Sequence, residues 1–335
     1  MSKLVIPQNY QDKFNVFDTQ KAIKFAKEAF QENLGKNLNL TRVSAPLFVS
    51  SISGLNDNLS GVERPVNFDI LHYNQEAEVV HSLAKWKRLA LKKYDFWPGN
   101  GLYTDMNAIR RDEELDNLHS IYVDQWDWEK VIAPEQRNLD YLKKSVNQIV
   151  LALKATELQI SGKYHQIQPF INTKVHFISS QQLLDKYPTL DTKAREEAIC
   201  QEYGTVFIMQ IGDNLSNNKP HDQRAPDYDD WSLNGDLLIW YPILQQAIEL
   251  SSMGIRVDAK TLEEQLEKAN CTNRVSLNFH QQLLNNKLPL TIGGGIGQSR
   301  LCLVLLQKAH IGEVQVSIWP EDTINKCKQA GINLL

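Results

Sequence analysis

The segment Val123-Asp124-Gln125-Trp126-Asp127-Trp128-Glu129 alternates polar acceptors with large or bulky side chains. Successive side chains of a strand point to opposite faces, so the pattern predicts a strand over residues 121–129. One face of this strand then holds Gln125, Asp127 and Glu129, and we interpret it as the floor of a wet cleft that binds a polar ligand. The opposite face, suited to a cover of helices, holds Tyr122, Asp124, Trp126 and Trp128. An ordinary solvent-facing strand would show the same alternation.

A second strand is predicted over residues 102–110, followed by the polar turn 111–117. A connection this short favours an antiparallel hairpin rather than a crossover helix. Helical periodicity predicts helices over 19–34, 82–93, 141–156, most of 260–285 and 300–308, with Gly35 as a stop signal and Ser82 as a cap. A strand carrying Pro46 over 40–48 favours a sheet edge, and a buried strand is predicted over 237–240. Strands and helices do not alternate regularly, which indicates an α+β fold rather than a doubly wound sheet.

Composition excludes several classes of protein. The 335 residues are 42% hydrophobic with a formal net charge of -4, which is typical of a folded chain and does not favour a nucleic-acid partner. Residues 1–15 contain no signal-peptide pattern, and no apolar run is long enough to span a membrane. The cysteines, at 200, 271, 302 and 327, lack metal-site spacing and read as reduced thiols. We therefore expect a cytoplasmic protein with no membrane partner.

The run Gly293-Gly294-Gly295-Ile296-Gly297-Gln298-Ser299-Arg300 has the wrong spacing for a dinucleotide-binding loop. Glycines at 293, 295 and 297 would remove side chains from one face of an extended segment, so a flat ligand could lie on the backbone. Arg300, at the start of the next helix, could then bind a phosphate. A plain glycine turn before a helix is the alternative.

Two arginines and several acids complete the candidate site. Arg110 and Arg111 end the first hairpin strand, where either could bind a phosphate or remain a solvated turn charge. The polar stretch 213–236 has the length of a functional lid. It contains Asp227, Asp229 and Asp230, of which Asp227 and Asp230 could equally be surface acids. Asp236 and Glu249 flank the strand at 237–240 and could hold Mg²⁺, which prefers carboxylate and phosphate oxygens.

These elements together resemble the catalytic motifs of class II aminoacyl-tRNA synthetases. The resemblance rests on Arg110, the Gln125 strand, the segment Glu249-Leu250-Ser251-Ser252-Met253-Gly254-Ile255-Arg256 and the glycine run ending at Arg300. The Gln125 strand is closest to the aspartyl and asparaginyl branch of that family. The segment around Pro46 is similar to its first, dimer-forming motif.

A closer resemblance, from about Lys21 to Trp319, is to the bacterial ammonia-dependent asparagine synthetases. The matching stretches are Asp57-Asn58-Leu59-Ser60-Gly61, His81-Ser82-Leu83-Ala84-Lys85-Trp86-Lys87-Arg88, His119 to Glu129, Arg224-Ala225-Pro226-Asp227-Tyr228-Asp229-Asp230-Trp231, Leu233-Asn234-Gly235-Asp236 and Thr291 to Leu301. The resemblance implies one class II synthetase-like catalytic domain over residues 1–335. Its expected fold is a mostly antiparallel β-sheet flanked by helices, in a homodimer.

The resemblance also implies a reaction and residue roles. The reaction is amidation of L-aspartate by ammonia with ATP and Mg²⁺, through a β-aspartyl-adenylate, with release of AMP and pyrophosphate. The implied catalytic residues are Asp57, as the base for ammonium, Arg110 and Gln125. Implied substrate-binding residues are Ser82, Lys87, Asp127, Ser251 and Arg256, implied ATP-binding residues are Arg110, Ser120, Ser252, Gly295 and Arg300, and implied metal ligands are Asp236 and Glu249. Lys85, Lys87 and Arg88 could instead form one solvated helix face.

The chain departs from the family pattern at two places. Trp231-Ser232 runs almost directly into Leu233, which shortens the connection after the aspartate-rich loop. Arg111 offers a second register for the phosphate-binding arginine. Two other functions are compatible with the same motifs: a tRNA-dependent ligase or amidation partner, and a catalytically silent regulatory subunit. The first predicts a basic RNA-binding face, and the second predicts loss of the arginines or acids, all of which are present.

Overall fold

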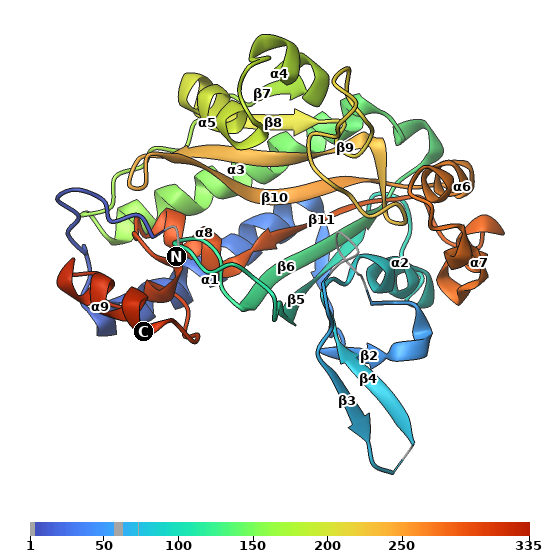
Figure 1. Ribbon diagram of the computed structural model, residues 1–335, viewed down its shortest axis with the longest axis horizontal. Helices are drawn as coiled ribbons and strands as arrows, with labels where there is room; N and C mark the ends of the chain where they lie inside the picture. The colour runs from blue at the N-terminus through green and yellow to red at the C-terminus, as the bar shows by residue number, and fades with distance from the viewer. Residues whose placement is uncertain (1–3, 57–62, 73) are drawn as a thin grey trace.

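The computed structural model describes residues 4–56, 63–72 and 74–335. Within these residues the strands form an eight-stranded sheet in the order β1-β5-β6-β11-β10-β9-β8-β7 and a three-stranded sheet in the order β2-β4-β3 (Figure 1). The strands are β1 Leu40–Arg42, β2 Phe48–Ser50, β3 Asn67–Ile70, β4 Gln75–Val79, β5 Gly101–Ile109, β6 Tyr122–Val131, β7 His176–Ser179, β8 Thr205–Met209, β9 Asp229–Tyr241, β10 Gln246–Arg256 and β11 Thr291–Gly297.

The large sheet is mixed. β1 pairs in parallel with β5, and β7 pairs in parallel with β8, whereas the other neighbouring strands of this sheet are antiparallel in the described residues. The predicted hairpin is confirmed, since β5 and β6 pair antiparallel along the whole of β5. The predicted strand near Pro46 is two short strands, and β1 lies at the sheet edge, as a proline-bearing segment favours.

Helices cover the two faces of the large sheet, as Figure 1 shows. α1 packs along α3 on one face, where Phe30 of α1 lies 4.8 Å from Trp126 of β6 between ring centroids. Trp126 and Trp128 are both fully buried there, which confirms the predicted helix-covered face. The helices are α1 Val16–Leu38, α2 Ala84–Lys93, α3 Leu139–Lys163, α4 Ser180–Lys186, α5 Thr192–Tyr203, α6 Ala259–Lys268, α7 Asn278–Leu284, α8 Gln298–Leu305 and α9 Glu321–Gln329.

Several predicted boundaries are wrong. α1 continues through Gly35 and ends at Leu38. The next residue, Asn39, has a φ of 58°, the left-handed conformation that terminates helices. The N-cap position of α2 is Leu83 rather than Ser82, although the Ser82 hydroxyl accepts the amide of Ala84 at 3.1 Å. The glycine run is strand β11, not a turn, and α8 begins at residue 298 rather than 300.

The largest error concerns the polar stretch 213–236. β9 begins at Asp229, so the loop ends near residue 228, and Ser232 lies within the strand. Two acidic residues can lie in this buried strand because each has a cationic partner. Asp229 accepts from Arg256 at 2.5 Å, and Asp230 accepts from Arg137 at 2.5 Å. Sequence periodicity could not supply these partners, which come from β10 and from the segment before α3.

The small sheet projects from the large one beside α2 (Figure 1). It carries exposed apolar side chains at and beside its strands, among them Leu47, Ile52 and Leu71. In the described part of the chain, no helix has the length and apolarity to cross a membrane.

Candidate active site

The central strands align a row of small and acidic residues on one face of the sheet. Asp127 of β6 lies opposite Gly295 of β11, Gly295 opposite Ser252 of β10, and Ser252 opposite Asp236 of β9. Two carboxylates therefore stand at the ends of a row whose middle has almost no side-chain volume. Residues from four strands meet here because the strands pair in this register, not because they are close in sequence.

The glycines of β11 make room for protein side chains. A Cβ at Gly295 would lie 2.5 Å from Oε1 of Gln125, and a Cβ at Gly293 would lie 2.7 Å from Nη2 of Arg256. The sequence interpretation, that the glycines let a flat ligand lie on the backbone, is thus incomplete. The absent side chains first allow Gln125 and Arg256 to lie across the strand.

Charged side chains form a buried network in the floor of the cleft. Arg256 donates to Glu129 Oε2 at 3.0 Å and to Asp229 Oδ1 at 2.5 Å, and these contacts hold the pKa of Arg256 above its usual value against the effect of burial. Burial raises the pKa of Asp229, although Arg256 opposes this shift. Since Glu129 is fully buried and paired, the alternative of an ordinary solvent-facing strand is wrong.

Lys87 of α2 enters the same floor. Its ammonium group donates to Oδ1 of Asp127, to the carbonyl of Trp128 at 3.1 Å and to the carbonyl of Gly294 at 3.3 Å. Burial lowers the pKa of Lys87, and Asp127 counteracts the shift. The neighbouring Lys85 and Arg88 are also buried, so these residues do not form a solvated helix face.

At the other end of the cleft, two acids face two arginines. Asp236 Oδ2 accepts from Arg224, and Arg300 donates to the backbone carbonyl of Glu249 at 3.0 Å. Solvent still reaches Glu249, yet the protein around it raises its pKa, and the like charge of Asp236 adds to the shift. The arginines offset only part of this effect.

The loop between β5 and β6 forms a further wall. Arg110 lies in this wall with Nη1 3.7 Å from Glu113, whereas Arg111 is exposed outside the cleft. His119 Nδ1 lies 2.9 Å from Asp116, whose carboxylate also accepts the His119 amide. Burial would raise the pKa of Asp116, but these hydrogen bonds lower it to about 2.

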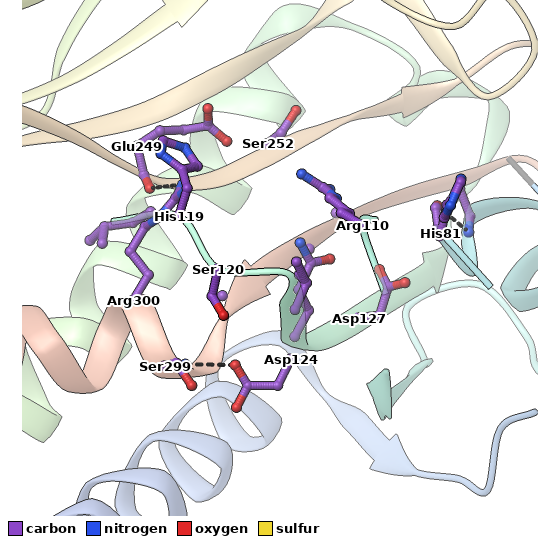
Figure 2. Close-up of a pocket in the computed structure, with 18 of the residues that line it drawn as sticks. His81, Arg110, His119, Ser120, Asp124, Asp127, Glu249, Ser252, Ser299 and Arg300 are labelled. Carbon is purple, nitrogen blue, oxygen red and sulfur yellow. Dashed lines mark hydrogen bonds between the residues drawn. The ribbon is translucent and has the colours of Figure 1, made fainter. Parts of the chain in front are cut away.

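These walls and floor enclose a cleft of about 260 Å³. Figure 2 shows Glu249, His119 and Arg300 at one end, Asp127 and His81 at the other, and Arg110 between them. The predicted site residues that line the cleft are Ser82, Lys87, Arg110, Ser120, Gln125, Asp127, Glu249, Ser252, Arg256, Gly295 and Arg300. Most of the predicted site is therefore brought together.

Three predicted residues are not among the lining residues. Ser251 lies in the row of Trp126, Ile296 and Leu237, which face the helix-covered core, so its alternation in β10 turns it away from the cleft. Asp236 is nine-tenths buried below the cleft surface and opposite Ser252. Asp57 lies outside the described residues.

The acids at this end fit a divalent cation in part. Within the described residues, no group of three or more His, Cys, Asp or Glu side chains could hold a metal ion. However, Oδ1 of Asp236 is buried with no hydrogen-bond partner among the residues that the structure describes, and burial raises the pKa of Glu249, which disfavours its anion. These two carboxylates, whose negative charge the protein neutralises only in part, suit Mg²⁺ with phosphate oxygens as its further ligands.

Sequence reasoning assigned no role to several residues now found in or beside the cleft. His119, Tyr228 and Ser299 line it, and Arg224 contacts Asp236 beside it. Each falls within or next to a quoted motif, but one-dimensional patterns did not show which members face the site. Asp227 and Asp230, considered as surface acids, are buried, and Asp227 accepts from Arg274 and His280 at 3.0 Å.

Comparison with known proteins gives consistent results. A family model described as "Aspartate-ammonia ligase" matches residues 17–331. The chain is 58% identical over 336 residues to the aspartate–ammonia ligase of Clostridium perfringens, with both chains covered completely. It is 55% identical over 333 residues to the aspartate–ammonia ligase of Pediococcus pentosaceus, with 99% of each chain covered.

Solved structures show the same fold at low sequence identity. The asparaginyl-tRNA synthetase of Pyrococcus horikoshii complexed with asparaginyl-adenylate superposes with a TM-score of 0.66 at 14% identity, covering 91% of this chain and 70% of that one. The corresponding complex from Entamoeba histolytica gives a TM-score of 0.64 at 14% identity, covering 90% of this chain and 66% of that one. The chain thus has a fold like that of class II aminoacyl-tRNA synthetases.

Proposed function

Because this chain belongs to the aspartate–ammonia ligase family, we propose that it uses ATP to join ammonia to the side-chain carboxylate of L-aspartate, which yields L-asparagine. The observation that carries the proposal is that Arg110 and Arg300 line the same cleft as Asp127, Gly295 and Ser252, which form one row across the sheet. Arg300 at one end and Arg110 in the middle of the cleft suit a triphosphate, and Asp127 at the other end suits an amino group.

In the first step, an oxygen of the aspartate side chain attacks the α-phosphorus of ATP, and pyrophosphate leaves. The carboxylate must be held in line with the leaving group while negative charge is neutralised. Arg110 stabilises the α-phosphate, and Arg300 binds the outgoing phosphates. Gln125, whose side chain lies over Gly295, donates to the α-phosphate or the activated carbonyl.

Mg²⁺, when bound by Asp236 and Glu249, would neutralise charge on the phosphates. Ser120 and Ser252 lie near the same end and contact the nucleotide. The hydroxyl of Ser120 already bonds the hydroxyl of Ser317 at 2.8 Å, so the geometry keeps it fixed in the wall.

The aspartate end of the cleft recognises the amino acid. Asp127 accepts from the α-amino group of the substrate. The substrate carboxylates receive positive charge and hydrogen-bond donors from Arg256, Lys87 and Ser82. Lys87 already has three acceptors, so direct contact with the substrate requires it to exchange one of them. This exchange couples substrate binding to the position of Asp127.

In the second step, the nitrogen of ammonia attacks the activated carbonyl, AMP leaves, and one proton is lost. Ammonia is mostly ammonium at neutral pH, so a base is required. Asp57 remains our predicted base. A homodimer, a single catalytic domain over residues 1–335 and a cytoplasmic location likewise remain predictions.

The test supplies purified protein with L-aspartate, ATP, Mg²⁺ and ammonium, and identifies all products. Asparagine, AMP and pyrophosphate in equal amounts are expected. ADP with phosphate would indicate an acyl-phosphate route and would refute the role of Arg110. Turnover that requires added tRNA would favour the tRNA-dependent ligase instead, and no turnover with intact ATP binding would favour a regulatory subunit.

A further inference from the structure

The first turn of α8 is held by a residue of a different element. α8 begins at Gln298, and its N-cap position is Gly297, which has no side chain to accept the unpaired amides of a helix start. Oδ1 of Asp124, on β6, accepts the backbone N–H of Ser299 at 3.0 Å (Figure 2). A carboxylate from the sheet therefore takes the part that a Ser or Asp at position 297 would have in an ordinary helix.

Asp124 is itself held tightly. Lys27 of α1 donates to its Oδ2 at 2.8 Å, and Gln315 donates to its Oδ1 at 3.3 Å. Gln315 also donates to Oγ of Ser299 at 3.0 Å, so two partners hold Ser299, one at its amide and one at its hydroxyl. Asp124 is 7% exposed, and both of its oxygens are used within the protein.

Arg300 follows Ser299 directly. Asp124 and Ser299 line the cleft, and in Figure 2 the Arg300 side chain extends from α8 toward Glu249 and His119. Its guanidinium donates to the carbonyl of Glu249 at 3.0 Å. Asp124 fixes the backbone of residue 299, and the carbonyl of Glu249 fixes the guanidinium of Arg300. The direction of the Arg300 side chain therefore depends on both contacts.

We infer that Asp124, balanced in charge by Lys27, is a positioning residue that fixes the first turn of α8 and thereby aims Arg300 at the phosphates of ATP. The inference rests on the proposed function, in which Arg300 binds those phosphates. It explains why a carboxylate occurs on the helix-covered face of β6, which otherwise holds aromatic side chains. It also explains how α8 can begin without a capping side chain at its N-cap position, Gly297.

The experiment compares ATP binding with turnover. Asp124→Ala removes the acceptor for Ser299, and we expect KM for ATP to rise about 5- to 30-fold, the factor that one lost helix cap would give. The values of kcat and KM for aspartate should stay near those of the wild type, since the lost binding is the same in ground and transition states. The double variant Asp124→Ala with Arg300→Ala should bind ATP no more weakly than Arg300→Ala alone.

A second set of variants keeps the acceptor. Lys27→Met should also raise KM for ATP, because it leaves Asp124 buried without its counter-charge. The double variant Lys27→Met with Asp124→Asn has no charge at either position and keeps a side-chain oxygen that accepts the Ser299 amide. A neutral buried acceptor needs no counter-charge, so we expect KM for ATP to return to within about twofold of the wild type. Lys24→Met, on the exposed side of α1 with Glu28 as its partner, is the matched control and should change nothing.

Additive effects of Asp124→Ala and Arg300→Ala would overturn the inference, as would an equal loss in all kinetic constants or failure of Asp124→Asn to restore Lys27→Met. An Arg300→Ala variant with unchanged ATP binding gives a different result: it would refute the role of Arg300 in the proposed function, and the inference with it. Isothermal calorimetry with Mg²⁺ and ATP, without aspartate, provides the binding measurement.

Discussion

At the scale of single residues, the structure distinguishes two neighbouring arginines that the sequence leaves equivalent. Arg110 lines the cleft with its side chain partly buried, and Arg111 is exposed. The backbone amide of Arg110 bonds the carbonyl of Ile121 at 2.8 Å, so Arg110 belongs to the end of the hairpin and Arg111 to its turn. Strand pairing therefore selects the register.

We predict that Arg110→Ala lowers kcat about 10²- to 10³-fold, the usual cost of losing one preorganised donor to a developing charge. Arg110→Lys should restore little, because an ammonium cannot replace a planar, bidentate donor. Arg111→Ala is the matched control and should retain nearly full activity in steady-state assays. Equal losses in the two alanine variants would contradict the assignment.

A second prediction at this scale concerns Glu249. Its pKa is raised in the folded protein, so the native state binds more protons than the unfolded state at pH values above the ordinary glutamate value. Stability should therefore fall as pH rises through this window when no cation is present. Glu249→Gln removes that effect, so its free energy of unfolding relative to the wild type should increase from pH 5 to pH 8.

Urea denaturation at several pH values, without ATP or Mg²⁺, measures this difference. Glu264→Gln serves as a control, because Glu264 is a surface residue that pairs with Lys260, 3.7 Å away on the same helix. A difference between Glu249→Gln and wild type that does not change with pH would show that Glu249 is not held in an unfavourable charged state.

At the scale of elements, the glycines of strand β11 make room for different neighbouring groups. A Cβ at Gly293 would lie 2.7 Å from both Arg256 and the backbone carbonyl of Trp128, which cannot move away. A Cβ at Gly295 meets only the end of the Gln125 side chain at such short range. Gly162, in α3, has open space around it.

We predict three different outcomes for alanine at these positions. Gly293→Ala should destabilise the fold by about 1–3 kcal/mol, as overpacking does. Gly295→Ala should leave the unfolding midpoint nearly unchanged but lower kcat at least tenfold, because Gln125 is displaced, as even a small misplacement of a catalytic group can cost about 10². Gly162→Ala should stabilise the protein by roughly 0.5–1 kcal/mol through helix propensity.

Thermal unfolding together with steady-state kinetics separates these effects. If Gly295→Ala kept full activity, Gln125 would have no part in the reaction, or the side chain would have another equivalent position. If Gly293→Ala were as stable as the wild type, the close packing of Arg256 against β11 would not hold in solution.

At the scale of the whole molecule, the projecting small sheet presents apolar surface to solvent. Ile52 is 88% exposed and Leu71 is 83% exposed, and within the small sheet Phe48 packs edge-on against Phe68. Exposed apolar patches of this kind commonly mark association sites. The segment that contains Pro46 and Leu47 adjoins them, which agrees with the predicted dimer-forming role of that segment.

We predict that sedimentation equilibrium gives twice the chain mass of 38.4 kDa. Ile52→Glu combined with Leu47→Glu should then raise the dissociation constant by at least about tenfold, since burying an unpaired charge at an interface is costly. Leu158→Glu, on the exposed side of α3, is the control. A monomer at micromolar concentration would refute the predicted homodimer.

The sequence alone determined the features that depend on local pattern. The alternation around Gln125 predicted which side chains of β6 share a face, and the short connection predicted the antiparallel hairpin with β5. Most of the site residues assigned from the long, specific motifs also line the cleft. These inferences succeed because side-chain direction in a strand and the geometry of a short turn are local properties of the backbone.

Only the tertiary structure decided which charged groups are buried partners. Asp229 and Asp230 belong to a strand because Arg256 and Arg137 neutralise them, and Ser251 faces the core because of the register of β10. Likewise, Asp124 holds the start of α8, more than 170 residues further along the chain. Such pairings join distant segments, and their free energy depends on burial and distance, neither of which is present in a one-dimensional pattern.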